Sequence, residues 1–424
     1  MLTLKKTTPP PPIPKKLKTL SFFSGIGGIE LGLQEYIDLC GMCEMDPFNI
    51  EILTRHYPEV TLYDNIDNFP LSSSSFLETD LIIAGSPFQE CNKTDPKAHR
   101  FKGKSISLVW KLLEIVDSYQ PRFLFLENSS NLVNNVLYDI IQRLDLLGYD
   151  SRWITLSSTK VGALHRRNKF FLLACRRAHK ISKPSNPHLI THCHTRILIP
   201  SLPPNLESLL SDSHLWRDEP DISRVTALYP PSSRIKNRIR SIGNAVIPHQ
   251  ARQAFRLLLM LNISPTTRNQ TLEHPQTFSL VETLEYSWKD SQKYLIPIDV
   301  YTNRPDSSGI LMNDRYYKFP TFPTKCFNTP VYPPTIQRFQ SSHSIPTPTS
   351  MEYIIRTHNK KSCPGANKSI SLNQYLAMFP TRNTSLPEIT QDGYLVDKTL
   401  SLETKIPNPQ WLEWLMGFPL DWTD

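Results

Sequence analysis

A glycine-rich turn, with the sequence FFSGIGGIE over residues 22–30, lies between an apolar run and a helical pattern. Glycines let the backbone approach a ligand closely, and the helix that follows offers N–H groups to it. A dinucleotide fingerprint requires glycine at the sixth position of G-x-G-x-x-G, and Glu30 stands there when the count starts at Gly25. The turn therefore disfavours nicotinamide. It favours another small ligand, and the alternative is a turn that only packs the helix on the strand.

Other charged residues are placed so that their side chains could bind ligands. Glu44, in CEMDPF, stands where a second strand is expected to end, and a carboxylate there can accept both ribose hydroxyls. Basic clusters at 166–169, 176–180 and 234–240 could contact phosphates. A solvated surface is the alternative for each of them. We reject zinc binding at His192-Cys193-His194, because no second pair of ligands lies nearby.

The elements that must position these residues alternate between strand and helix from Lys18 onward. Apolar runs such as TLSFF, TDLIIAG, RFLFLEN and NKFFLLAC predict buried strands, and SLVWKLLEIVDSY and IELGLQEYI have helical spacing. This order predicts an α/β sheet, mostly parallel, with helices on both faces. A further helical pattern runs over 236–263, and the chain after about Ser264 is rich in Pro, Thr, Ser and aromatic residues.

Composition narrows the function classes. The net charge of +8 and pI of about 9.0 favour a polyanionic partner, although solubility alone could explain them. No stretch reaches the roughly 18 consecutive apolar residues of a membrane span. The seven cysteines are scattered and odd in number, which predicts a reducing interior rather than a disulfide framework.

Six segments, in order, resemble those of the DNA (cytosine-5) methyltransferases of bacteria and phages. They are FFSGIGGIELGL, CEMD, DLIIAGSPFQ, FLFLENS, GALHRRNKFFLLA and RSIGNAVIPHQA. The segment NPQWLEWLMGFPLDWTD also resembles a family segment, which in most members precedes the G-N-A-V helix but here follows it by roughly 160 residues.

The resemblance implies a Rossmann-like, S-adenosylmethionine-dependent methyltransferase fold with a smaller irregular DNA-recognition region. We expect a flexible tail at 1–17, a catalytic domain at 18–175 and 238–263, a connecting segment at 176–237, and target recognition within 264–424. The implied cosubstrate is S-adenosyl-L-methionine, with no metal. Its implied contacts are Phe23, Gly25, Gly27, Gly28, Glu44, Asn65, Ile66, Leu108, Asn244 and Val246.

The implied catalytic positions are Phe88, Glu127, Arg167 and Lys169. In this family a cysteine thiolate adds to cytosine C6, and a glutamate near N3 supports the developing charge. Phe88 occupies the cysteine's position and offers no nucleophile. Cys91 lies three residues further on, and using it would require a shift of the loop. Lys169 replaces an arginine that meets cytosine O2, and lysine offers a point charge rather than a fork.

The family resemblance predicts transfer of a methyl group to C5 of a flipped cytosine in double-stranded DNA, within the cytoplasm of a bacterial or phage-infected cell. A companion methyltransferase subunit or a cognate restriction enzyme is a further expected partner. The alternative from another class is an inactive family member that binds DNA and cofactor as a regulatory or partner subunit. An RNA methyltransferase on the same fold ranks last, because no separate RNA-binding module is visible.

Overall fold

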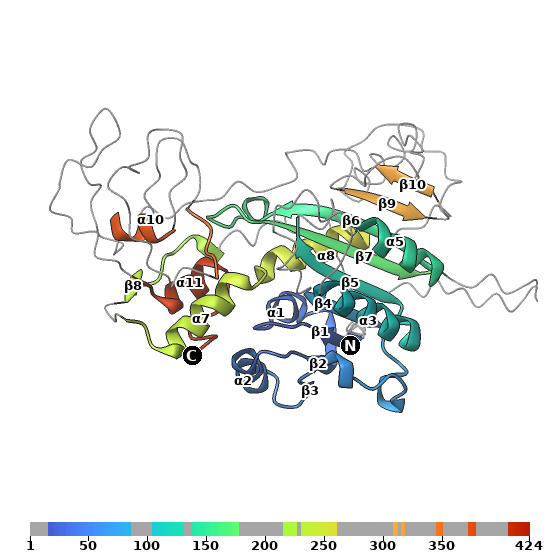
Figure 1. The fold of residues 1–424 in the computed structure, drawn as a ribbon. Coiled ribbons are helices and arrows are strands. Elements are labelled where there is room, and N and C mark those ends of the chain that lie inside the picture. Colours follow the sequence, from blue (N-terminus) through green and yellow to red (C-terminus); the bar gives the residue numbers. More distant parts are fainter. Residues whose placement is uncertain are drawn as a thin grey trace, which may run out of the picture.

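The computed structural model describes residues 16–85, 104–130, 137–177, 215–226, 230–260, 308–312, 315–318, 345–350, 372–378 and 406–424. A twisted sheet runs through the centre of this part of the chain (Figure 1). Its strand order is β10-β9-β6-β7-β5-β4-β1-β2-β3. The strands are β1 Leu17–Phe22, β2 Ile37–Cys43, β3 Thr61–Tyr63, β4 Leu81–Gly85, β5 Phe123–Ser129, β6 Tyr149–Ser157, β7 Asn168–Arg176, β9 Ser308–Met312 and β10 Arg315–Lys318.

Strands β3, β2, β1, β4 and β5 run parallel, whereas β7 is antiparallel to both β5 and β6. The central strand β1 pairs with β2 on one side and with β4 on the other. The prediction of an α/β sheet is therefore confirmed, but the sheet is mixed, with four parallel and four antiparallel pairings among the described strands. Strands β9 and β10 extend the sheet, because β9 pairs antiparallel with β6 and β10 with β9.

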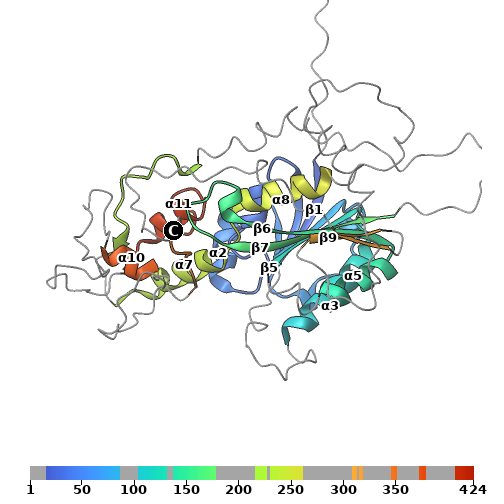
Figure 2. The same cartoon turned by 90° about the horizontal axis from the view of Figure 1, so that it is seen from above.

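Helices cover both faces of the sheet (Figure 2). Helices α3 (Lys104–Tyr119) and α5 (Leu137–Leu146) cover one face, and α1 (Gly28–Leu33) and α8 (Pro248–Met260) cover the other. Neighbouring residues of one strand enter opposite clusters: Ile82 packs toward α3 and α5, and Ile83 packs toward α1 and α8. Because both faces of the sheet are buried, the sequences of the central strands are continuous apolar runs rather than alternations of apolar and polar residues.

Two predicted helices have different bounds in the structure. The pattern expected over 29–37 forms a helix only to Leu33, and Ile37 already begins β2. The pattern over 236–263 is split into α7 (Ser233–Asn244) and α8, because Ala245 has extended backbone and Pro248 opens the second helix. Proline lacks an N–H and disfavours helical backbone just before it, so the break falls at this point.

A third apolar cluster lies beside the sheet and joins segments distant in sequence. It combines Ile26 and the helix α2 (Pro47–His56) with α7, α10 (Leu372–Met378) and α11 (Pro409–Leu415). The short strands β8 (Val225–Thr226) and β11 (Ile406–Pro407) pair beside it. The segment 406–424 thus packs against the same elements that carry the glycine turn.

Among the described residues, no helix is long and apolar enough to cross a membrane. Over the same residues, no group of three or more His, Cys, Asp and Glu side chains could hold a metal ion. His192, Cys193 and His194 lie outside the described residues.

The contact between α1 and α8 gives a test of the fold. A Cβ added at Gly32 would lie 2.3 Å from the carbonyl oxygen of Pro248, so Gly32→Ala must push the two helices apart. We expect this change to lower the free energy of unfolding, measured by urea denaturation, by about 1–3 kcal/mol. The exposed Gln34→Ala, at the end of the same helix, should stay within about 0.5 kcal/mol of the parent. Equal stability of all three proteins would contradict the packing.

Candidate active site

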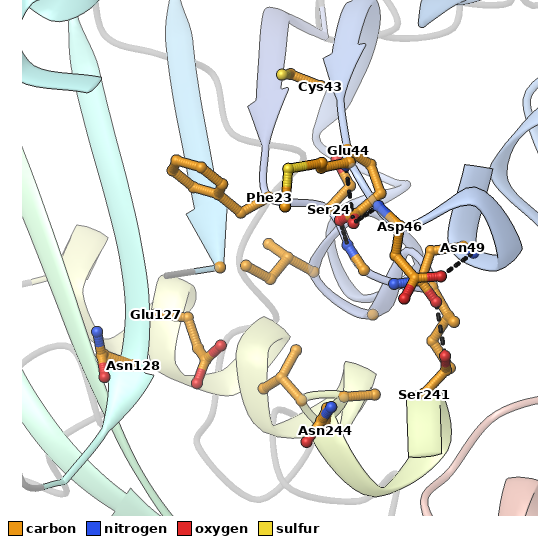
Figure 3. A pocket seen from close by; sticks show the side chains of 18 of the residues that line it. Phe23, Ser24, Cys43, Glu44, Asp46, Asn49, Glu127, Asn128, Ser241 and Asn244 are labelled. Carbon is orange, nitrogen blue, oxygen red and sulfur yellow. Dashed lines mark hydrogen bonds between the residues drawn. The ribbon is translucent and has the colours of Figure 1, made fainter. Parts of the chain in front are cut away.

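A cavity of about 460 Å³ opens at the carboxyl ends of the parallel strands (Figure 3). Its walls come from the turn after β1, the end of β2, the end of β5 and the start of β7, together with the junction of α7 and α8. The structure brings together twelve of the predicted site residues here: Phe23, Gly25, Gly28, Glu44, Asn65, Ile66, Leu108, Glu127, Arg167, Lys169, Asn244 and Val246. Gly27 does not line the cavity, and Phe88 lies outside the described residues.

The turn after β1 is held in left-handed backbone conformations. Phe23 has φ 55°, Gly25 φ 58° and Gly27 φ 83°. Positive φ is costly for phenylalanine and persists only where the surroundings fix it. The N–H of Phe23 donates to Cys43 O (2.8 Å), and the residue lines the cavity. Gly27 is the N-cap of α1, and a Cβ there would meet Leu53 and Tyr57 at 3.3 Å.

The Glu44 carboxylate is fixed by three backbone N–H groups. Gly25 N donates to Oε2 (2.7 Å), and Met45 N and Asp46 N donate to Oε1 (3.0 and 2.9 Å). A carboxylate offers about four acceptor sites. Roughly one site therefore remains for a ligand, where the sequence predicted contacts to two ribose hydroxyls. The carboxylate also holds the glycine turn to the end of β2 (Figure 3).

The opposite wall carries a buried ion pair. Lys169 Nζ lies 2.6 Å from Glu127 Oε1, and the two side chains are 12% and 7% exposed. Glu127 Oε1 has no partner of hydrogen-bond geometry among the described residues, so the contact with Lys169 is an ion pair rather than a well-aligned hydrogen bond. Burial lowers the pKa of Lys169, and the charge of Glu127 opposes that shift. An acceptor and a donor thus lie side by side at the edge of the cavity.

Arg167 lines the cavity but binds backbone. Its guanidinium donates to the carbonyl oxygens of Gly243 (2.8 Å), Asn244 (3.2 Å) and Pro348 (3.3 Å). The segment 345–350 lies against Gly243 so closely that a Cβ there would meet Thr349 C at 2.3 Å. Arg167 therefore ties the end of α7 to the segment 345–350, in which Pro348 lies 181 residues after Arg167 itself.

Sequence reasoning missed a row of polar residues that joins α2 to α7. Arg240 pairs with Asp46 (2.8 Å), and Ser241 Oγ donates to Asn49 Oδ1 (2.7 Å). All four line the cavity. Asp46 caps α2 and is followed by proline at the first helical position, a capping signal that could have placed this helix start beside Glu44. Nothing in the local sequence indicates the partners on α7.

Cys43 is the one cysteine among the described residues that lines the cavity. Burial raises the pKa of its thiol to about 12, and the nearby Glu44 carboxylate adds to the shift. The thiol stays protonated near neutral pH, and a protonated thiol is a poor nucleophile. Cys43 is therefore poorly suited to act as a nucleophile. Cys91 lies outside the described residues.

His165, beside the pocket strand β7, gives a pH-dependent prediction. It is fully buried, neither ring nitrogen has a hydrogen-bond partner among the described residues, and burial lowers its pKa to about 3, with Arg167 adding to the shift. Because the unfolded chain takes up a proton near pH 6.5 and the folded chain does not, stability falls as pH drops below about 6.5.

We expect His165→Phe to remove that dependence. Between pH 7 and pH 5 the parent should lose about 2 kcal/mol more of its unfolding free energy than the variant. Urea denaturation at both pH values measures the difference, and any change in packing cancels because it acts at both. Parallel pH profiles for the two proteins would show that His165 is not the group that titrates.

The C-5 cytosine-specific DNA methylase model matches residues 17–360. Type II methyltransferase M.CviJI of Paramecium bursaria Chlorella virus IL3A is 29% identical over 164 residues, 38% of this chain and 43% of that protein. Type II methyltransferase M2.BsuMI of Bacillus subtilis (strain 168) is 30% identical over 167 residues, 37% of this chain and 42% of that protein. The chain thus spans less than half the length of these relatives.

Among solved structures, the Entamoeba histolytica methyltransferase EhMeth is 19% identical, with a TM-score of 0.34, and the match covers 40% of this chain and 56% of that one. The family model covers most of the chain, including every cavity residue named above. The chain belongs to the C-5 cytosine-specific DNA methylase family.

Proposed function

We propose that this cavity binds S-adenosyl-L-methionine and a flipped cytosine of double-stranded DNA, and that the chain serves methylation of cytosine C5. The observation that supports this most is the sharing of one cavity by Glu127, at the end of β5, and the glycine turn with Glu44. A site for a nucleoside-bearing ligand and a carboxylate suited to a base thus face each other.

The residues present fit the cosubstrate. The volume of about 460 Å³ lies within the range of small-ligand sites. A Cβ at Gly25 would meet nothing within 4 Å, so this backbone borders open space that a ligand can occupy. The Phe23 ring offers an aromatic face for the adenine, and the remaining acceptor site of Glu44 suits one ribose hydroxyl.

When bound, S-adenosylmethionine supplies an electrophilic methyl group. The proposed roles of the chain are to hold the ligand at Phe23, Gly25, Gly28 and Glu44, with Asn65, Ile66, Leu108, Asn244 and Val246 around it. Asn65 Oδ1 already accepts from Asp67 N (3.0 Å) and caps its own turn, so its amide nitrogen is the group we assign to the adenine. Gly27 supports the turn from behind rather than touching the ligand.

The Glu127–Lys169 pair is matched to the edge of cytosine. Cytosine presents an amino donor at C4 and acceptors at N3 and O2, and the pair presents an acceptor beside an ammonium donor. We assign Glu127 to the amino group, from which its carboxylate accepts, and to N3, to which it donates only when it carries a proton; Lys169 is assigned to O2. Arg167 acts from behind by holding the end of α7 through the carbonyls of Gly243 and Asn244.

Phe88 is the residue on which catalysis depends. It stands at the position of the family's nucleophilic cysteine, and a phenyl ring can neither attack C6 nor take part in proton transfer. This favours a second candidate function: a subunit that binds cofactor and DNA without turnover and acts through a companion methyltransferase or restriction enzyme. Both candidates place the chain on DNA in the cytoplasm, with Arg240 and the exposed Arg234 and Lys236 of α7 near the phosphates.

Methyl transfer from labelled S-adenosylmethionine to DNA separates the two candidates. We expect Phe88→Cys to transfer methyl groups at least about a thousandfold faster than the parent chain. Phe88→Ser, a similarly small substitution whose hydroxyl is not ionised at neutral pH, is the control and should stay near the parent rate. Turnover by the unmodified chain would contradict the non-catalytic candidate, and its loss in Cys91→Ser would identify the nucleophile. Absence of cofactor binding in the parent would contradict both candidates.

The buried pair gives a stability test that does not depend on turnover. Lys169→Met leaves the Glu127 charge buried without its partner and should lower the free energy of unfolding by about 3–5 kcal/mol. Lys169→Met combined with Glu127→Gln removes both charges and should recover most of that loss. Urea denaturation near pH 7 measures each protein. If the single and double variants are equally unstable, the two side chains are not paired in the folded protein.

A further inference from the structure

The segment 406–424 reaches the glycine turn from a distant part of the sequence. Trp422 Nε1 donates a hydrogen bond of 2.7 Å to the carbonyl oxygen of Ile26. Ile26 lies between Gly25 and Gly27, both of which have positive φ. The bond is buried, because Ile26 is 1% and Trp422 8% exposed. It joins residues 396 positions apart.

Helix α2 fixes the Trp422 side chain and backbone from the other side. The indole ring stacks on the imidazole of His56, with ring centroids 3.6 Å apart and an interplanar angle of 7°. The carbonyl oxygen of Trp422 accepts from Arg55 Nη2 and interacts with His56 Nε2, each at 2.8 Å. The position of the indole N–H is therefore determined by several independent contacts.

A buried polar network anchors the segment to α7. Arg238 Nη2 pairs with Glu413 Oε1 (3.0 Å), and Arg238 Nε donates to Thr423 Oγ1 (3.0 Å). Thr423 N also donates to Glu413 Oε1 (2.9 Å). The same helix ends at Asn244, which lines the cavity. Segment 406–424 thus bridges the two walls of the pocket, the glycine turn and the end of α7.

We propose that Trp422 is a positioning residue for the cofactor site. Its indole N–H holds the carbonyl group of Ile26 in one orientation. This restricts the backbone of the glycine turn, so that Gly25 N keeps its hydrogen bond to Glu44 and the turn keeps the conformation that faces the ligand. Without this bond, the Ile26 carbonyl oxygen is a buried acceptor with no donor, which costs free energy. That cost favours other conformations of the turn over the one that binds the cofactor. This inference rests on the proposed binding of S-adenosylmethionine.

A matched pair of substitutions isolates the hydrogen bond. Trp422→Phe keeps an aromatic ring near His56, removes the indole N–H and shortens the side chain by one ring. Trp414→Phe makes the same chemical change in the same segment, at a ring that is also 8% exposed and whose Nε1 has no partner among the described residues. Any general effect of exchanging a buried tryptophan should appear in both variants.

Titration calorimetry with S-adenosylmethionine, and with S-adenosylhomocysteine, measures the outcome on the full chain. We expect Trp422→Phe to weaken both affinities about tenfold, as for the loss of one hydrogen bond to a buried acceptor. Affinity for a DNA duplex, measured without cofactor, should stay within about twofold, and Trp414→Phe should keep all three affinities. A merely structural role would lower the melting temperature without this selective loss for the cofactor.

The outcomes are distinguishable. Equal cofactor affinity in Trp422→Phe and the parent, or an equal loss in Trp414→Phe, would overturn the positioning role. Failure of the parent chain itself to bind either compound would instead overturn the proposed function. If Trp422→Phe does not fold, Arg55→Met replaces it, because Arg55 is exposed on α2 and the hydrogen bond that the described structure gives it is to the Trp422 carbonyl. Its expected loss of cofactor affinity is about two- to threefold, and no loss would contradict the proposal.

Discussion

The parallel pairing of β1 on both of its edges is the constraint on which the site depends. Because β1 lies between β2 and β4, the chain leaves β1 toward β2 and later returns to the other edge of β1 as β4. Helix α1, which follows β1, and helix α3, which follows β4, cover opposite faces of the sheet. An opening results at the carboxyl end of the central strand. The glycine turn follows β1 and Glu44 follows β2 at this opening, and Glu127 closes β5 on the neighbouring side. The hydrogen bonds from Gly25 and Asp46 to Glu44 then fix the first two of these to each other.

The strands and the residues that directly follow them could be predicted from the sequence, because strands buried on both faces are written as uninterrupted apolar runs. Glu44 was placed from the expected end of a second strand, whereas Phe23 and Glu127 were assigned from the family resemblance. The partners supplied by distant segments could not be. A periodic pattern records which face of an element is buried, but it does not record that Arg167 meets Pro348 or that Trp422 meets Ile26. The break before Pro248 had a visible local cause, whereas the pairing of Asp46 with Arg240 had none. The domain bounds and the role of Phe88 stay predictions.

The buried charges of the site are poor candidates for a purely stabilising role. Removing two charges from water is costly, and a well-packed apolar pair of similar size is often as stable. The Glu127–Lys169 pair is kept at the edge of a cavity, where its polar atoms can meet a polar ligand on entry. His165 and Arg167 lie on the same stretch of chain, and burial lowers the pKa of both. The electrostatics of this edge therefore favour a ligand that supplies acceptors to Lys169 and a donor to Glu127, which is the pattern of a pyrimidine with an exocyclic amine.

The remote origin of segment 406–424 has a consequence for the newly made chain. The ribosome completes strands β1 to β7 and helix α8 by residue 260. Trp411 and Trp422, which join the apolar cluster of Ile26 and Phe48, follow only after roughly 160 further residues, a delay of roughly 10–30 s at typical translation rates. During that interval the glycine turn and α2 lack the part of their apolar cover that segment 406–424 supplies. Nascent chains are therefore open to chaperone binding, or to exchange of this segment between two copies, until translation of the segment ends.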